Sequence, residues 1–168
     1  MMYRGAAVVM GVASCGKTSV REGIAARLGA HFTEGDRLHP KANVEKMSAG
    51  IALTDEDRWP WLTLVGECVR GDSGRIASCS ALKRAYRDHL TAQAGRPVAF
   101  VFLDGSRKIL EQRIAARRFH FMPPSLLASQ LLTLERPGPD ECAKSFDIAR
   151  TVDDIVVEAC AWLLQLRH

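Results

Sequence analysis

The chain lacks the features that would assign it to several common protein classes. No apolar run approaches the roughly 18 residues that a membrane-spanning helix requires. The five cysteines include no C-x-x-C pair, which argues against a disulfide framework or a zinc site and favours a reducing cytoplasm. Lysines and arginines form no dense block, so the net charge of +4 does not indicate a nucleic-acid surface. We therefore expect neither a membrane nor a nucleic acid as partner.

A further absence concerns asparagine. Asn43 is the single asparagine of the chain, so the Asn-Lys-x-Asp signature by which GTPases select guanine is missing. An apolar run at 98–103 ends at Asp104 and is similar to a Walker-B strand, which would favour a motor-type ATPase. At 168 residues the chain is short for the oligomeric apparatus of such an ATPase.

The most informative stretch that is present is residues 11–18, GVASCGKT, which matches the phosphate-binding pattern G-x-x-x-x-G-K-[ST]. The apolar run at 6–10 predicts a buried strand before it, and the spacing of Val20, Ile24 and Leu28 predicts a helix after it. Backbone N–H groups at such a helix N-terminus favour phosphate. We therefore expect this loop to bind a nucleotide.

The phosphate loop assigns individual roles to two side chains. Lys17 is expected to reach the β- and γ-phosphates, and the Thr18 hydroxyl to ligate Mg²⁺. The expected cofactors are accordingly ATP and Mg²⁺. The residues expected to contact the nucleotide are Gly11, Ala13, Ser14, Cys15, Gly16, Lys17, Thr18 and Ser19.

Strand and helix signals alternate along the rest of the chain. Further strands are predicted at 31–33, 75–79, 97–103 and 145–148, with helices between them and a closing amphipathic helix at 152–166. Thr54-x-x-Asp57 predicts a capped helix start. This alternation predicts one α/β domain over residues 1–168: a P-loop three-layer sandwich with a five-stranded parallel sheet, helices on both faces and a helical lid at about 113–135.

Three ordered segments outside the loop resemble one family. They are FTEGDRLHP at 32–40, CSALKRAYRD at 79–88, and the segment from Arg113 through HFMP at 120–123 and SQ at 129–130 to LE at 134–135. With Asn43, Lys46 and Asp57 between them, they are similar to the gluconokinase family of P-loop small-molecule kinases, which is related to shikimate kinase. The resemblance runs from about Val8 to Ile155.

The resemblance implies an ATP-dependent kinase, cytoplasmic and homodimeric, that phosphorylates D-gluconate to 6-phospho-D-gluconate. A related kinase for another small acid or nucleotide is one alternative. A nucleotide-binding regulatory module without turnover is the other.

Candidate residues for binding the phosphoryl acceptor come after the second predicted strand, within the part of the chain that the resemblance covers. Asp36 is placed to accept a proton from the substrate hydroxyl, or to hold Mg²⁺ through water, or only to form a turn. His39 is a candidate for contacting substrate hydroxyls. Arg58, Lys83 and Arg87 are the cations expected to meet a sugar-acid carboxylate, Arg58 and Arg87 foremost because a guanidinium suits a carboxylate.

The predicted lid supplies two further candidates. Arg113 and Arg117 are spaced i, i+4, and a mobile lid that delivers arginine to the transferring phosphate fits both this spacing and the family. We therefore expect Arg113 and Arg117, together with Lys17 and Asp36, to be catalytic. The alternative is a basic face of an amphipathic helix.

The chain departs from the family pattern at four positions. Ala13 and Ser14 stand where Ser and Gly are usual, Ala52 stands where Pro is usual, and Phe119 stands where a small residue is usual. Ser14 matters most, because glycine there allows the loop to turn tightly beside the phosphate. None of the four removes a group that would do chemistry.

Overall fold

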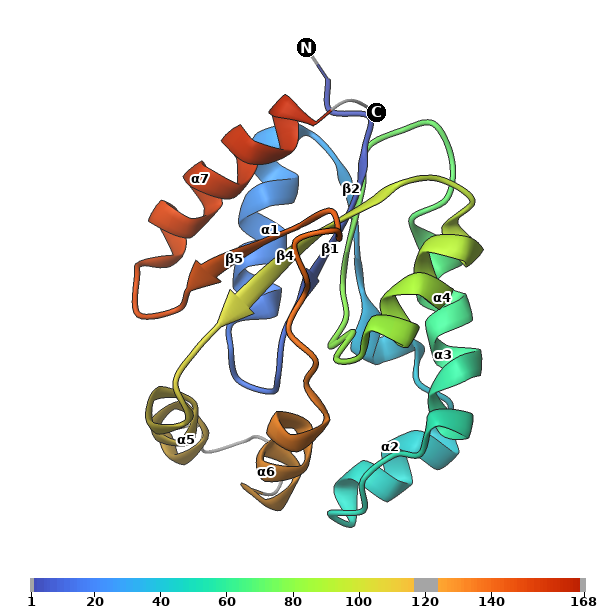
Figure 1. The fold of residues 1–168 in the computed structure, drawn as a ribbon, viewed down its shortest axis with the longest axis vertical. Helices are drawn as coiled ribbons and strands as arrows, with labels where there is room; N and C mark the ends of the chain where they lie inside the picture. The colour runs from blue at the N-terminus through green and yellow to red at the C-terminus, as the bar shows by residue number, and fades with distance from the viewer. Residues whose placement is uncertain (1, 117–123, 167–168) are drawn as a thin grey trace.

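The computed structural model describes residues 2–116 and 124–166. Its centre is a parallel sheet of five strands in the order β2-β3-β1-β4-β5 (Figure 1). The strands are β1 (Ala6–Met10), β2 (His31–Glu34), β3 (Arg75–Ser78), β4 (Val98–Asp104) and β5 (Ala143–Asp147). The predicted five-stranded parallel sheet is confirmed.

Helices cover both faces of the sheet, which confirms the three-layer arrangement. On one face lie α1 (Lys17–Leu28) and α7 (Val152–Gln165), and on the other lie α3 (Asp55–Cys68) and α4 (Arg84–Ala94) (Figure 1). The short helices lie beyond the carboxyl ends of the strands, and the labelled ones among them are at the bottom of Figure 1. They are η1 (Gly35–Leu38), α2 (Lys41–Ser48), α5 (Arg107–Ala116) and α6 (Pro124–Thr133).

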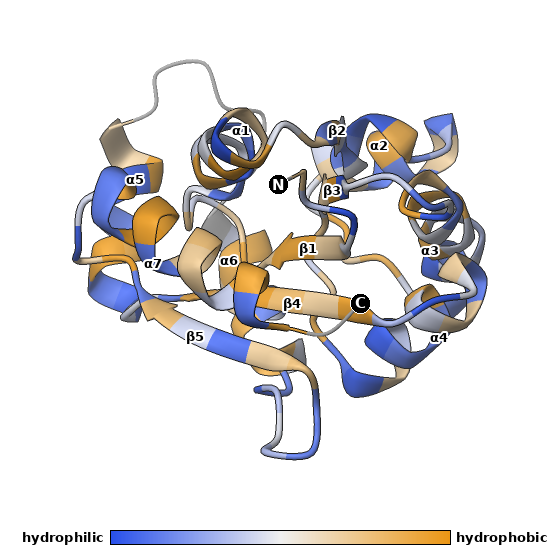
Figure 2. Ribbon diagram, turned by 90° about the horizontal axis from the view of Figure 1, so that it is seen from above, coloured by the Kyte–Doolittle hydropathy of each residue, from blue (hydrophilic) through white to orange (hydrophobic). Residues whose placement is uncertain are grey.

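The core runs along β1 and β4, which pair side by side inside the sheet. All of β1 is buried, as are residues 98–103 of β4, and Figure 2 shows both strands in apolar colours between the helices. A strand covered on both faces needs apolar side chains on both, which explains the continuous apolar runs in the sequence. Burial of each Val, Leu or Phe side chain contributes about 1.5–3 kcal/mol to the stability of the fold, so the core holds the carboxyl ends of β1 and β4 in place.

Helix α3 begins where its sequence predicts, whereas strand β5 begins earlier than predicted. Thr54 caps α3 as predicted: its hydroxyl accepts the Asp57 N–H at 3.2 Å, and the Asp57 carboxylate accepts the Thr54 N–H at 2.9 Å. The edge strand β5 begins at Ala143, two residues before the predicted start at 145. Its pairing with β4 extends the strand through Ala143 and Lys144, whose side chains carry no strand signal of their own.

Candidate active site

The phosphate loop joins β1 to α1 with the strand–turn–helix geometry expected from its sequence. Gly16 has φ of 96° and caps α1, a conformation that favours glycine. A Cβ at Gly11 would lie 2.7 Å from Cys15 Sγ and 2.9 Å from the Leu103 carbonyl oxygen, so only glycine fits there. Helix α1 starts at Lys17, which leaves the N–H groups of its first turn free to face an anion.

Lys17 and Thr18 project from the first turn of α1. Lys17 Nζ donates to the carbonyl oxygens of Gly11 at 2.9 Å and Val12 at 3.0 Å, so its ammonium is held along the loop. Thr18 Oγ1 donates to the Glu34 carboxylate at 3.1 and 3.3 Å. Lys17 therefore lies along the loop, where phosphate binding is predicted, and Thr18 reaches across to the end of β2.

Glu34 is a site residue to which the sequence analysis assigned no role. Its carboxylate also accepts from Ser78 Oγ at 3.1 Å and pairs with Arg21 at 3.2 Å. Hydroxyl and carboxylate oxygens are ligands that Mg²⁺ prefers, usually together with waters and substrate phosphates. Thr18 and Glu34 fit such a site. The described residues contain no group of three or more His, Cys, Asp or Glu that would hold a metal unaided.

Ser14 adopts a left-handed backbone conformation in the phosphate loop, with φ of 65°. The residue is 6% exposed, and its Oγ has no hydrogen-bond partner in the described part of the chain. A buried hydroxyl without a partner carries a desolvation cost. The serine in place of the family's usual glycine therefore leaves an unused hydrogen-bonding group in the loop.

A cavity of about 430 Å³ opens beside the loop. Residues expected to bind the nucleotide and residues expected to bind the acceptor line this same cavity, and Gln130 lines it as well. The expected residues are Ser14, Lys17, Thr18, Asp36, His39 and Arg58. Its apolar wall is formed by Val44, Met47, Ala52, Leu53 and Leu126. A few polar groups converging on a partly apolar cavity are typical of a small-molecule site.

Asp36 is brought to the cavity by η1, which follows β2 directly. Gly35 packs so closely on β3 that a Cβ would overlap the Ser78 carbonyl oxygen, so glycine is required there. Trp61 Nε1 donates to the Gly35 carbonyl at 2.8 Å and ties η1 to α3. The exposed Asp36 side chain therefore stands on an anchored turn and lines the cavity, and its role toward a substrate stays a prediction.

His39 stacks on Trp61, with ring centroids 3.9 Å apart. Burial lowers the pKa of His39 to about 4. Nearby Asp36 raises this pKa, and Arg58 lowers it, but both effects are smaller than that of burial. The ring is therefore uncharged at neutral pH.

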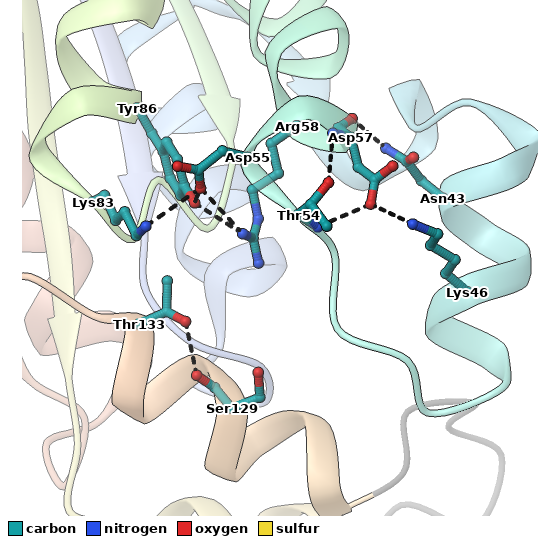
Figure 3. Close-up of polar contacts among 10 residues, drawn as sticks. All are labelled: Asn43, Lys46, Thr54, Asp55, Asp57, Arg58, Lys83, Tyr86, Ser129 and Thr133. Carbon is teal, nitrogen blue, oxygen red and sulfur yellow. Dashed lines mark hydrogen bonds and ion pairs between the residues drawn. The ribbon is translucent and has the colours of Figure 1, made fainter.

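Arg58 extends from α3 into a polar network that Figure 3 shows. Its Nη1 donates to the Tyr86 hydroxyl at 2.8 Å, and that hydroxyl donates in turn to Asp55. Lys83 Nζ lies 3.3 Å from the same Asp55 carboxylate. The hydrogen bond from Tyr86 lowers the pKa of Asp55, with smaller effects of Lys83 and Arg58. Arg58 lines the cavity, whereas Lys83 contacts it only through this network.

The structure corrects the prediction that Arg87 contacts the substrate. Arg87 is 1% exposed and forms a bidentate pair with Glu141, at 2.7 and 3.1 Å. It also donates to the backbone carbonyls of Ala81, Leu82 and Glu135. The guanidinium N–H groups of Arg87 are therefore occupied by contacts within the protein, which join α4 to the segment 135–141. Arg87 is a structural residue.

Of the two arginines predicted to act from the lid, Arg113 lies within the described residues and Arg117 does not. Arg113 donates to the carbonyls of Cys15 at 3.2 Å and Ile148 at 2.9 Å, so it adjoins the phosphate loop from α5. Arg117 lies outside the described residues, as does Phe119. The catalytic role of both arginines stays a prediction.

These features define the class of the protein. A parallel sheet in this order, with a phosphate loop between β1 and α1 and a cavity at the carboxyl ends of the strands, is typical of P-loop kinases for small molecules. A shikimate kinase from Aquifex aeolicus shares the fold, with a TM-score of 0.57 over 94% of this chain and 95% of its own, at 12% identity.

Closer relatives narrow the class, although no protein-family model matches the chain. A gluconokinase of Gluconobacter oxydans is 55% identical over 138 residues, which are 80% of this chain and 77% of the relative. A gluconokinase structure from Sinorhizobium meliloti is 49% identical, with a TM-score of 0.90 over 98% of this chain and 94% of its own. The chain belongs to the gluconokinase family, as its sequence segments indicated.

Proposed function

We propose that the protein transfers the γ-phosphoryl group of ATP to the terminal hydroxyl of D-gluconate, giving 6-phospho-D-gluconate and ADP. The observation that carries this proposal is that Lys17, Asp36 and Arg58 line one cavity. A phosphate-binding cation, a carboxylate for a hydroxyl and a guanidinium for a carboxylate match the groups of a nucleotide and a sugar acid. Membership of the gluconokinase family supports the same reaction.

On the nucleotide side, the chain supplies positioning and charge. N–H groups of the loop and the first turn of α1 hold the phosphates, and Lys17 neutralises charge that builds up on them in the transition state. Thr18 and Glu34 would hold Mg²⁺ against the phosphate oxygens. When bound, this ion neutralises phosphate charge and orients the phosphoryl group.

On the acceptor side, Asp36 orients the attacking hydroxyl and takes its proton. Arg58 meets the gluconate carboxylate with the guanidinium nitrogens that Tyr86 leaves free, and Lys83 supports it through Asp55. The hydrogen bond to Tyr86 restricts the rotamers of Arg58, which lowers the entropy cost of binding.

The segment at about 113–135 is proposed to act as a lid. Arg113 already adjoins the phosphate loop, and Arg117 would add a second cation when the lid closes over the phosphates. We also propose a homodimer in the reducing cytoplasm, in keeping with the five free cysteines. In the described part of the chain, no helix is long and apolar enough to cross a membrane.

The test is ADP release by the purified protein with MgATP and a panel of acceptors. We expect gluconate to stimulate ADP release strongly, and shikimate and nucleoside monophosphates to leave it at the basal rate. Stimulation by another acceptor and not by gluconate would move the protein to a different small-molecule kinase. Nucleotide binding without turnover on any acceptor would indicate a regulatory module.

A further inference from the structure

Asn43 is a buried amide that joins two elements of the site. It lies in α2, is 3% exposed, and donates from Nδ2 to the backbone carbonyl of Asp57 at 2.9 Å. The same nitrogen lies 3.2 Å from His39 Nδ1. A carbonyl oxygen only accepts, so the amide must turn its nitrogen, and not its oxygen, toward Asp57 and hence toward His39.

The orientation of the amide determines where His39 carries its proton. Nδ2 has two hydrogens, and the second one points to His39 Nδ1, which must therefore accept. A neutral imidazole that accepts at Nδ1 is protonated at Nε2. The ring is neutral because burial outweighs the effect of Asp36, which favours the charged form, while Arg58 opposes it.

A further feature of His39 is its place at the cavity. His39 lines the cavity, and stacking on Trp61 holds the plane of its ring. Within residues 2–116 and 124–166, Nε2 of His39 has no hydrogen-bond partner. A fixed donor thus stands close to Asp36, whose carboxylate oxygens are hydrogen-bond acceptors.

We propose that Asn43 is a positioning residue that holds His39 as a neutral Nε2–H donor, and that His39 and Asp36 together select a hydroxyl group of the acceptor. A hydroxyl donates to one partner while accepting from another, so it satisfies both residues at once. An ammonium group in the same place has no lone pair for the His39 donor. This inference deepens the proposed function, on which it rests for the identity of the acceptor.

The tautomer is measured directly by NMR on the full chain with ¹⁵N-labelled histidine. Long-range ¹H–¹⁵N spectra distinguish protonated from unprotonated ring nitrogens, and His39→Gln identifies the His39 signals by their loss. We expect Nε2–H in the unmodified protein, without nucleotide or acceptor. An Nδ1–H tautomer or an imidazolium at neutral pH would overturn the proposal, and this measurement needs no folded Asn43 variant.

A double-mutant cycle then separates positioning from simple support of the fold. Asn43→Asp places a carboxylate that accepts from Nδ1–H, so the Nε2 donor is lost or the ring becomes charged. We expect this variant to raise the gluconate KM by about tenfold, the scale of one hydrogen bond, with little change in the ATP KM.

His39→Gln is the matched background, because a glutamine amide N–H extends toward the position of Nε2 and has no tautomers. There, Asn43→Asp should change the gluconate KM less than about twofold. An equal rise in both backgrounds would overturn the proposal and leave Asn43 as a support for α3. If the unmodified protein shows no gluconate-dependent ADP release, the proposed function fails, while the NMR result still decides the tautomer.

Discussion

The side-chain oxygen of Gln130 accepts a hydrogen bond of 2.7 Å from the backbone N–H of Ala13, so α6 is joined to the phosphate loop. Both residues line the cavity. The partial negative charge of this oxygen therefore lies beside the place where phosphates are expected. Since α6 lies within the proposed lid, we expect Gln130 to couple the lid to the bound nucleotide.

Gln130→Glu should test this contact electrostatically. A carboxylate still accepts from Ala13 but adds a full negative charge near the phosphates, so we expect the ATP KM to rise by about tenfold, or roughly 1.4 kcal/mol. High salt should reduce the effect by screening. The control is Gln130→Ala, which removes the contact without adding charge. Steady-state kinetics that show the same ATP KM for both variants would contradict the charge argument.

Asp36→Asn should separate chemistry from nucleotide binding. The amide keeps the size of the side chain but does not take a proton, so we expect turnover to fall by about 10²–10⁴, the usual contribution of a general base. Binding of MgATP, measured by calorimetry, should be unchanged because Asp36 is proposed to contact the acceptor and not the nucleotide. Lys17→Ala is the contrasting variant, since it should impair both binding and turnover. Turnover near that of the unmodified protein would return Asp36 to a turn-forming role.

The buried pair of Arg87 and Glu141 should govern stability and not catalysis. Arg87→Met removes the charge that compensates Glu141, which is expected to cost about 3–5 kcal/mol of the free energy of unfolding. The double variant Arg87→Met with Glu141→Gln should recover part of this loss. Denaturant titration measures both. A large rise in the gluconate KM with unchanged stability would instead restore Arg87 as a substrate contact.

The same pair predicts a pH dependence. Hydrogen bonds from Arg87 lower the pKa of Glu141 below its ordinary value. The pair therefore stabilises the protein fully above the ordinary glutamate pKa of about 4.3, and this stabilisation is lost as pH falls through the lower pKa of the folded state. We expect the thermal midpoint of Glu141→Gln to fall less between pH 5 and pH 3, roughly the range of that titration, than that of the unmodified protein.

Local and long-range contacts explain which parts of the site were predictable. The phosphate loop and Asp36 follow directly from short patterns, because each is placed by the strand that precedes it. Arg87 was misassigned because spacing along a helix says nothing of Glu141, which is 54 residues away in sequence. Gln130 received no role because its partner is 117 residues away, and a backbone N–H leaves no mark in a sequence.

Ser14 offers the sharpest test of whether the phosphate loop works as it stands. A non-glycine residue in the left-handed region costs roughly 1–2 kcal/mol. Ser14→Ala keeps this strain and removes the hydroxyl, whereas Ser14→Gly removes both. We therefore expect Ser14→Gly to be more stable than Ser14→Ala by about 1 kcal/mol in thermal or denaturant unfolding, since the greater freedom of glycine in the unfolded chain offsets part of the relief.

The kinetics of the same two variants decide what the hydroxyl does. Its buried oxygen has no partner among the described residues and belongs to the loop that is expected to bind the nucleotide, so we expect a nucleotide phosphate to be its partner. Both variants should then raise the ATP KM by a similar factor within about tenfold, or roughly 1.4 kcal/mol, because both lose the same contact. If Ser14→Gly instead increases activity many-fold while Ser14→Ala does not, the serine impairs the loop, and a regulatory nucleotide-binding module becomes the better description of this protein.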